Sequence, residues 1–223
     1  MRVAVLVTGG KDSTLALRRV LDESYDVRYL VSMIPLREDS WMFHYINIHL
    51  VDLFAEAVEI PLRKAETCGI KEKEVEDLKH LIEKLNIEGI VSGAIASDYQ
   101  KARIDGICRH LSLESIAPLW HKKPLNILNE ILDLEFEVII TGVYANGFNK
   151  EWLGRKIDED AIKDLIELNR EYDVSFVGEG GEYETLVLDA PFFKKRIKVI
   201  KAEKVWENQS GYFLVTKAKL ENK

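Results

Sequence analysis

The sequence predicts an α/β fold, a parallel sheet with helices on both faces, followed by a smaller C-terminal α+β part. Three observations predict it. Short apolar runs alternate with helical patterns over residues 1–145 at the spacing of βαβ units. The pair Gly9-Gly10 lies between the first apolar run and the first helical pattern. Turn residues become frequent near residue 145, so we expect one domain over residues 1–145 and a second over residues 146–223.

Each element follows from its own periodicity. Short apolar runs predict strands, and apolar positions that recur at three to four predict helices. In the second domain we expect a helix over 158–172 and two strands, 196–205 and 212–219, joined by a turn at 208–211. In the first domain the predicted strands span 3–7, 27–33, 58–60, 89–94, 115–117 and 138–143, and the helices about 13–23, 40–57, 71–85, 98–111 and 124–134.

Composition limits the class of protein. The 223 residues are 47% hydrophobic and carry a formal net charge of −7. No apolar run reaches the roughly 20 residues that span a bilayer, and the chain starts directly in a strand, so we expect no membrane contact, no signal peptide and a cytoplasmic location. Cys68 and Cys108 form no CxxC pair, which argues against a zinc site or a disulfide framework.

Charge bears on the choice of partner. The basic residues are scattered except at residues 194–196. A nucleic-acid-binding protein usually shows a basic stripe, so we expect no direct nucleic-acid partner and favour a protein or a small substrate. Whether the chain forms a homodimer stays open.

Residues 8–14 carry the clearest chemical signal. Gly9 and Gly10 let the backbone turn tightly and approach a ligand. The helix start behind them offers unpaired N–H groups and a positive dipole end, which suit a phosphate. Lys11 adds a cation, and Asp12 is placed to hold Mg²⁺. Hydroxyls come from Thr8, Ser13 and Thr14.

This loop is not the common P-loop. That motif has a glycine five residues before its Gly-Lys pair and a Ser or Thr directly after the lysine. Here these positions hold Val5 and Asp12. The segment therefore predicts a nucleotide-phosphate site of another kind.

Several of the segments that could contact a ligand fall at the carboxyl ends of the predicted strands, where open α/β sheets bind ligands. They are loop 8–14, Met33, Gly93 with Ala94, and Gly142. Their agreement predicts a single site along one edge of the sheet.

A second group of residues lies in the C-terminal part. Glu179, Glu182 and Glu184 surround the pair Gly180-Gly181. In an extended chain Glu182 and Glu184 would point to one side, and Tyr183 and Thr185 to the other. Carboxylates this close repel one another unless a metal or a cationic group lies between them. The residues alone favour the simpler alternative, an acidic turn in water.

Taken together, the motifs resemble the diphthine–ammonia ligase family. The first loop resembles the SGGKDS loop of the wider ATP pyrophosphatase (PP-loop) superfamily, with Thr8 in place of the first serine. The acidic segment is specific to the smaller family, and the motifs cover most of the chain. They are residues 8–13, Met42-Phe43-His44, Gly93-Ala94-Ile95 with Ser97, Tyr99-Gln100 with Arg103, Pro118-Leu119-Trp120, and GEGGEYETLVLDAPFF at 178–193.

The resemblance implies a Rossmann-like, adenine nucleotide alpha hydrolase-like fold and an enzyme that uses ATP and Mg²⁺. Such enzymes amidate diphthine on translation elongation factor 2 with ammonium, through an acyl-adenylate, and release AMP and pyrophosphate. At this length we expect no glutamine-hydrolysing domain, so free ammonium or a separate partner supplies the nitrogen. The alternatives are a PP-loop ATP pyrophosphatase acting on another acid, and a nucleotide-binding regulatory module without turnover.

The resemblance also assigns roles. A catalytic set comprises Lys11, Asp12, Ser13, Glu182 and Glu184, with Asp12 as the metal ligand. The nucleotide set comprises Thr8, Gly9, Gly10, Lys11, Asp12, Ser13, Thr14, Met33, Gly93, Ala94, Tyr99 and Arg103. The acceptor set comprises Trp120, Asn146, Trp152, Glu179, Gly180, Gly181, Tyr183 and Thr185. The alternatives are that Arg103 pairs with a surface carboxylate, that Tyr99 packs in the core and that the tryptophans pack between the two parts.

Overall fold

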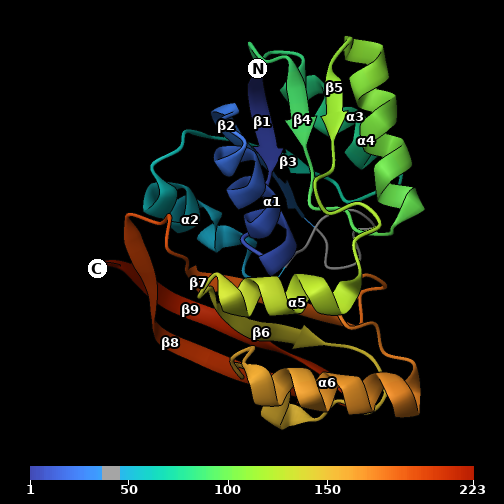
Figure 1. The fold of residues 1–223 in the computed structure, drawn as a ribbon, viewed down its shortest axis with the longest axis vertical. Coiled ribbons are helices and arrows are strands. Elements are labelled where there is room, and N and C mark those ends of the chain that lie inside the picture. Colours follow the sequence, from blue (N-terminus) through green and yellow to red (C-terminus); the bar gives the residue numbers. More distant parts are fainter. Residues whose placement is uncertain (37–45) are drawn as a thin grey trace. The chain divides into compact units, whose positions relative to one another are not determined.

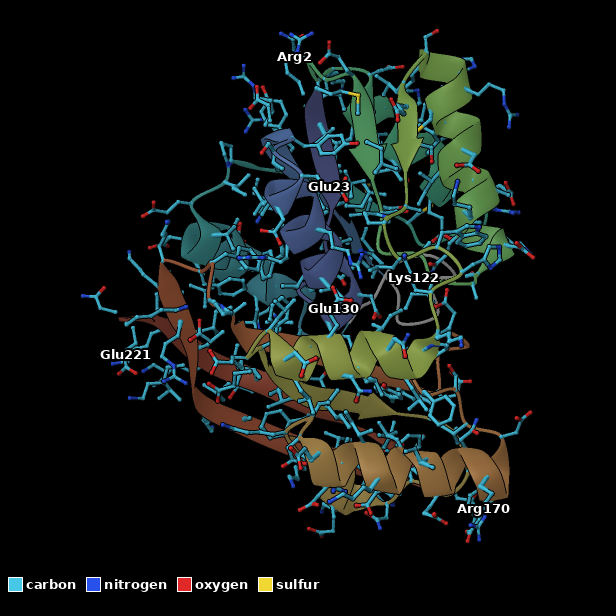
Figure 2. The ribbon with its side chains drawn as sticks, viewed as in Figure 1. Arg2, Glu23, Lys122, Glu130, Arg170 and Glu221 are labelled. Atoms are coloured by element: carbon cyan, nitrogen blue, oxygen red, sulfur yellow. The ribbon has the colours of Figure 1, made fainter. Side chains whose placement is uncertain are left out.

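The computed structural model describes residues 1–36 and 46–223. The expected motif Met42-Phe43-His44 and the start of the expected helix 40–57 lie outside these residues. The chain divides into two compact units, Met1–Trp120 and His121–Lys223. In each unit charged side chains project from the ribbon, as Glu23 does in the first and Arg170 in the second (Figure 2).

The first unit contains a five-stranded parallel sheet (Figure 1). Its order is β3-β2-β1-β4-β5, and every neighbouring pair is parallel. The order reverses between β1 and β4, and such a switch point is where open α/β sheets bind ligands. The strands are β1 (Arg2–Leu6), β2 (Asp26–Pro35), β3 (Leu62–Thr67), β4 (Gly89–Val91) and β5 (Glu114–Ile116).

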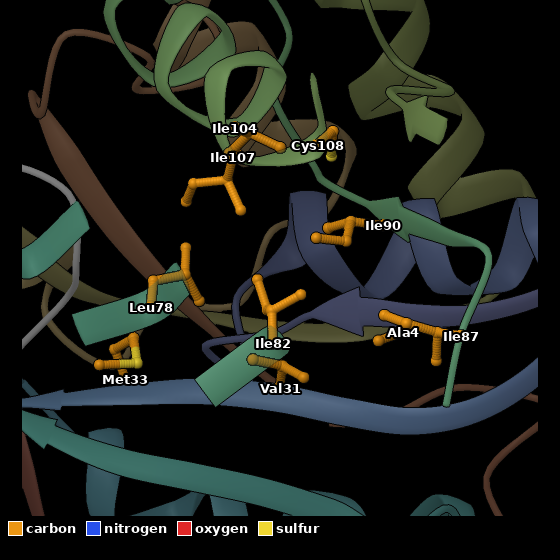
Figure 3. Close-up of a cluster of buried hydrophobic side chains, with 10 residues drawn as sticks. All are labelled: Ala4, Val31, Met33, Leu78, Ile82, Ile87, Ile90, Ile104, Ile107 and Cys108. Atoms are coloured by element: carbon orange, nitrogen blue, oxygen red, sulfur yellow. The ribbon is translucent and has the colours of Figure 1, made fainter. Parts of the chain in front are cut away.

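Helices cover both faces of this sheet. Figure 3 shows buried side chains of α3 (Lys73–Ile82) and α4 (Asp98–Leu111) packed against those of β1, β2 and β4 in one cluster. Side chains alternate along a strand, so the neighbours of Ala4 in β1 face the other side, where α1 (Lys11–Asp22) packs. Ile48–Leu50 form the 3-10 helix η1, which leads into α2 (Val51–Val58).

The second unit contains a four-stranded antiparallel sheet of order β7-β6-β9-β8. Figure 1 shows α5 (Pro124–Asp133) and α6 (Glu159–Tyr172) on opposite sides of β6. The strands are β6 (Glu137–Val143), β7 (Tyr183–Asp189), β8 (Lys195–Glu207) and β9 (Ser210–Asn222), and a short 3-10 helix, η2 (Lys150–Trp152), follows β6.

The structure corrects the expected position of residues 124–143. These residues were expected in the first domain, but α5 and β6 belong to the second unit and β6 pairs with β7 and β9. The chain therefore divides after Trp120 rather than near residue 145. Six of the seven β6 residues are buried, and a strand covered on both faces has the same uniformly apolar sequence in a parallel or an antiparallel sheet.

The third strand was also misplaced. Residues 58–60 were expected as a strand, but Val58 ends α2, and Glu59 adopts the left-handed conformation that terminates helices. The strand is β3, which follows Pro61 at the edge of the sheet. Its sequence LRKAET has no apolar alternation because edge strands remain largely in water.

The helix expected over 40–57 begins later than predicted in the described residues, as η1 at Ile48 and α2 at Val51, because Asn47 before it has a left-handed backbone with φ of +61°. The remaining predicted elements are confirmed within a few residues. The bounds of α4 agree with the prediction because Ser97 caps its first turn by accepting a hydrogen bond from the Gln100 N–H. Over the described ranges, none of the helices is both long and apolar enough to cross a bilayer.

Replacing Leu78 by alanine tests the cluster in Figure 3. Leu78 is fully buried there, so the change should lower the free energy of unfolding by about 2–5 kcal/mol. Denaturant unfolding measures this loss. Ile70, which is 42% exposed, provides the control, because Ile70→Ala should stay within about 0.5 kcal/mol of the parent. Equal effects of both changes would contradict the proposed packing.

Candidate active site

The loop between β1 and α1 presents the backbone of the helix start. Gly9 has φ of +82°, a conformation that favours glycine. Gly10 is the extended N-cap residue of α1 and has no side chain that could cap the first N–H groups. These groups and the helix dipole therefore remain available to an anion.

Lys11 and Asp12 form a charged pair at this helix start. The Lys11 side chain is 2% exposed, and its Nζ lies 3.0 Å from Asp12 Oδ2. Asp12 Oδ1 is also buried, and within the described part of the chain it accepts no hydrogen bond. A buried carboxylate oxygen without a partner is costly, whereas Mg²⁺ is normally bound through oxygen ligands of this kind. The Asp12 oxygen therefore fits the expected metal ligand.

The hydroxyls of the loop stabilise its turn. Ser13 Oγ and Thr14 Oγ1 both donate to the Gly10 carbonyl, at 3.1 and 2.8 Å. The Thr8 N–H donates to Ser13 Oγ at 3.5 Å. Ser13 and Thr14 were expected to contact phosphate, and here they fix the backbone that would do so.

Gly93 brings the end of β4 against the start of α1. A Cβ atom at Gly93 would lie 2.7 Å from the Ser13 N atom and 2.8 Å from the Asp12 carbonyl carbon. Only a glycine allows this approach. Ala94 follows and is buried. Two segments far apart in sequence, 8–14 and 93–94, therefore meet at the switch point, as expected.

Met33 is a buried residue of the first unit. It was assigned to the adenosine, but its side chain is 2% exposed and packs in the cluster beneath α3 and α4 (Figure 3). It lies near the carboxyl end of β2, in the core of the first unit.

Tyr99 and Arg103 stack on one face of α4. The guanidinium carbon of Arg103 lies 3.5 Å from the Tyr99 ring centroid, and Arg103 Nη2 lies 2.5 Å from Glu72 Oε1. This hydrogen bond raises the pKa of Arg103. Arg103 thus forms an ion pair with a carboxylate, which was the alternative to phosphate binding. Tyr99 is half-buried rather than in the core.

Two residues on the loop before α3, Lys71 and Glu72, contact Tyr99 and Arg103, and the sequence indicated neither of them. Glu72 has a φ of +67°, and Lys71 Nζ lies 5.1 Å from the Tyr99 ring centroid. Neither belongs to a motif. A charged loop beside a distant helix has no periodic signal, so only the fold brings these residues together.

The acidic segment of the second unit forms a closed turn. Strand β7 begins only at Tyr183, so Glu182 belongs to the turn. Its Oε2 accepts a hydrogen bond from the Gly180 N–H at 2.8 Å, and its Oε1 accepts one from the Ser175 N–H at 3.3 Å. Glu182 therefore stabilises its own turn instead of sharing a strand face with Glu184. Gly181 has φ of +83°, which this turn requires.

Two of the aromatic residues assigned to the acceptor are buried. Tyr183 and Trp152 are 2% and 5% exposed, and Phe148 contacts both rings, at centroid distances of 6.0 and 5.2 Å. The Tyr183 hydroxyl donates to the Phe176 carbonyl at 2.6 Å. This cluster joins the acidic turn to the core of the second unit.

The remaining acceptor residues are more accessible. Asn146 is exposed, and Glu179, Glu184 and Thr185 are half-buried. In the first unit Trp120 is half-buried, and Lys101 Nζ lies 5.8 Å from its ring centroid. Throughout the described residues, no three Asp, Glu, His or Cys side chains lie close enough together to hold a metal ion.

The two units match the two domains of one family. The diphthamide synthase N-terminal domain matches residues 1–115, and the C-terminal domain matches residues 123–220. The chain belongs to the diphthamide synthase family. The two matches change over between residues 115 and 123, which agrees with the structural division after Trp120.

Curated relatives agree with this membership. Diphthine–ammonia ligases of Rattus norvegicus and Homo sapiens are each 37% identical over 95% of this chain and 88% of their own. That of Danio rerio is 33% identical over 100% of this chain and 98% of its own. The chain is thus a carbon–nitrogen ligase, and the family inferred from the motifs is confirmed.

Gly93→Ala should disrupt the switch point without unfolding the protein. The new methyl group would clash with the backbone at Asp12 and Ser13, so we expect ATP affinity to fall about tenfold or more. Calorimetric titration with ATP measures it. Gly106 lies within α4 and has open space around it, so Gly106→Ala should leave ATP affinity unchanged. Unchanged affinity in Gly93→Ala would contradict the role given to this contact.

Glu182→Gln tests whether this carboxylate is structural. A glutamine can replace only one of its two accepting oxygens, so the free energy of unfolding should fall by about 1–3 kcal/mol. Hydrogen exchange at Ser175 and Gly180 should also become faster. Glu207→Gln, a change at an exposed residue of the same unit, is the control. Unaltered stability and exchange would leave Glu182 free for the catalytic role first assigned to it.

Proposed function

We propose that the protein amidates diphthine on translation elongation factor 2 with ammonium and ATP, and produces diphthamide, AMP and pyrophosphate. One observation carries this proposal, the buried Lys11 paired with the half-buried Asp12 at the glycine-rich helix start of the switch point. Membership of the diphthamide synthase family selects this acceptor from the many carboxylic acids that an ATP pyrophosphatase could activate.

The reaction has two displacements. In the first, a carboxylate oxygen of diphthine attacks the α-phosphorus of ATP, the bond from that phosphorus to the bridging oxygen breaks, and pyrophosphate leaves. In the second, ammonia attacks the acyl carbon of the adenylate, the bond to the AMP oxygen breaks, and the nitrogen loses a proton. The first step creates most of the negative charge that the protein must stabilise.

The loop residues suit that first step. The N–H groups at the start of α1 and the Lys11 ammonium stabilise the charge that develops on pyrophosphate. Gly9 and Gly10 allow the phosphates to approach the backbone, and Ser13 and Thr14 hold the turn. Asp12 Oδ1 would bind Mg²⁺, which when bound neutralises part of the charge on the phosphates.

Arg103 is proposed as a second contact with the nucleotide, at the α-phosphate. It lies on α4, the helix that follows β4 from the switch point. Because Glu72 now holds its guanidinium, binding at the α-phosphate requires Arg103 to exchange one anion for another. Tyr99 keeps the guanidinium plane oriented by stacking beneath it.

The acceptor carries a quaternary ammonium group, which carboxylates and aromatic faces attract. Glu179 and Glu184, the half-buried carboxylates of the acidic segment, are the proposed contacts in the second unit. Since translation supplies the protein substrate, we place the activity in the cytoplasm.

A turnover assay with diphthine-bearing elongation factor tests the proposal. With ATP, Mg²⁺ and ammonium, the factor should show the small mass decrease of replacing a hydroxyl by an amino group, together with pyrophosphate release. Lys11→Met should lower kcat by about 10²–10³-fold, because it removes a buried cation from the leaving group. Lys84→Met, a change at an exposed lysine, should leave kcat unaltered.

Other outcomes separate the alternatives. Pyrophosphate release without any mass change of the factor would indicate a different acid. Bound ATP that stays intact with every component present would indicate a binding module.

A further inference from the structure

Strands β8 and β9 form a long ribbon in the second unit. They pair along almost their whole length, whereas β9 pairs with β6 only through Gly211 and Tyr212. Residues of β9 beyond Tyr212 therefore pair with β8 alone. Figure 1 shows the two antiparallel strands side by side, and Figure 2 shows the Glu221 side chain projecting outward from this part.

The register places lysines opposite lysines. Lys198 pairs with Lys219, and Lys201 pairs with Lys217. All four side chains are exposed. The pair next to Lys198 and Lys219, toward the C-terminal end of β9, is apolar. It is Ile197 opposite Leu220, and Ile197 is 1% exposed. One face of the ribbon is thus buried, and the other carries the four lysines, which we call the basic stripe.

The basic stripe is unfavourable in the isolated protein. Like charges directly opposite each other destabilise an antiparallel pair. Glu221 lies 2.7 Å from Lys198 Nζ, and Glu203 lies 3.6 Å from Lys201 Nζ. In the part of the chain that the structure describes, Lys217 and Lys219 form no direct ion pair, although the pKa of the Glu221 carboxyl is lowered by its hydrogen bond with Lys198 and also by the charge of Lys219. The repulsion is therefore only partly compensated.

The charge of this region also opposes that of the whole chain. Residues 194–223 contain nine Lys or Arg and three Glu, yet the chain carries a formal net charge of −7. In the sequence these lysines are spread over two strands, where they are separated by apolar residues. The hairpin register gathers them on one face.

Protection of an exposed sheet edge explains the presence of charge but not its sign. Lysines on edge strands prevent pairing with other chains. Lysine opposite glutamate would protect the ribbon equally well and would also stabilise it. Two lysine–lysine rows therefore indicate a binding partner that supplies the negative charge.

We propose that the basic stripe docks an acidic surface of the protein substrate, away from the modified residue. This inference rests on the proposed function, in which the acceptor is one residue of a large protein. A protein surface fits better than nucleic acid, because the stripe is short and the rest of the chain is acidic. An extended phosphate backbone would leave the stripe and meet that negative charge.

The double variant Lys217→Glu with Lys219→Glu tests this docking. It should weaken binding of the unamidated elongation factor about tenfold or more at low salt, with a smaller difference at high salt. The same variant should be at least as stable as the parent, because each lysine–lysine row becomes a lysine–glutamate row. Fluorescence titration with the labelled factor and thermal unfolding measure the two effects.

The matched control reverses the same amount of charge elsewhere. Lys84 and Arg109 are exposed residues of the first unit, and Lys84→Glu with Arg109→Glu should leave the affinity for the factor unchanged. Equal affinity of the stripe variant and the parent would overturn the proposal. So would an unchanged affinity for the factor combined with lost binding of a labelled single-stranded oligoribonucleotide, which would make the stripe a nucleic-acid surface.

Amidation of a short synthetic peptide carrying diphthine separates this inference from the proposed function. Such a peptide lacks the acidic surface, so the parent and the stripe variant should convert it at equal rates. A slower rate in the variant would assign the stripe to the reaction site and overturn the docking role. If neither protein converts the peptide, the proposed function fails. The titration with the factor still shows whether the basic stripe docks it.

Discussion

The close approach of Gly93 to the first turn of α1 is the constraint on which the nucleotide edge depends. A side chain at this position would occupy the space next to Asp12 and Ser13. Because none is present, the end of β4 lies against the N–H groups that face the switch point. The reversal of strand order provides the opening, and the missing Cβ atom lets two backbones share it.

Electrostatics explain why this edge is prepared for an anion. Burying a lysine is costly, and its attraction to a neighbouring aspartate offsets that cost only partly. Lys11 is nonetheless almost completely buried, and one oxygen of Asp12 has no hydrogen-bond donor within the described residues. A metal ion bound with the nucleotide would give this Asp12 oxygen a partner. The isolated protein thus holds one carboxylate oxygen in a costly arrangement that a ligand can relieve.

The second unit distributes its charges differently. Glu182 accepts hydrogen bonds from donors within its own turn, so this carboxylate, which was expected to be catalytic, stabilises the loop. Tyr183 and Trp152 are buried because their rings pack against Phe148. The lysines of the β8–β9 ribbon have the opposite character, because they repel one another across the strands. Charge that a unit leaves uncompensated is better evidence for a partner than charge that it satisfies.

By itself, the sequence determined the features that depend on neighbouring residues. The strand, glycine loop and helix over residues 2–22, the bounds of α4 and the family follow from local periodicity, capping and motifs. Only the tertiary structure decided which sheet β6 joins, where β3 lies, that Glu72 holds Arg103, and that lysines of β8 and β9 face one another. These features depend on pairing between distant segments, because a buried run or a scattered lysine does not specify its neighbour.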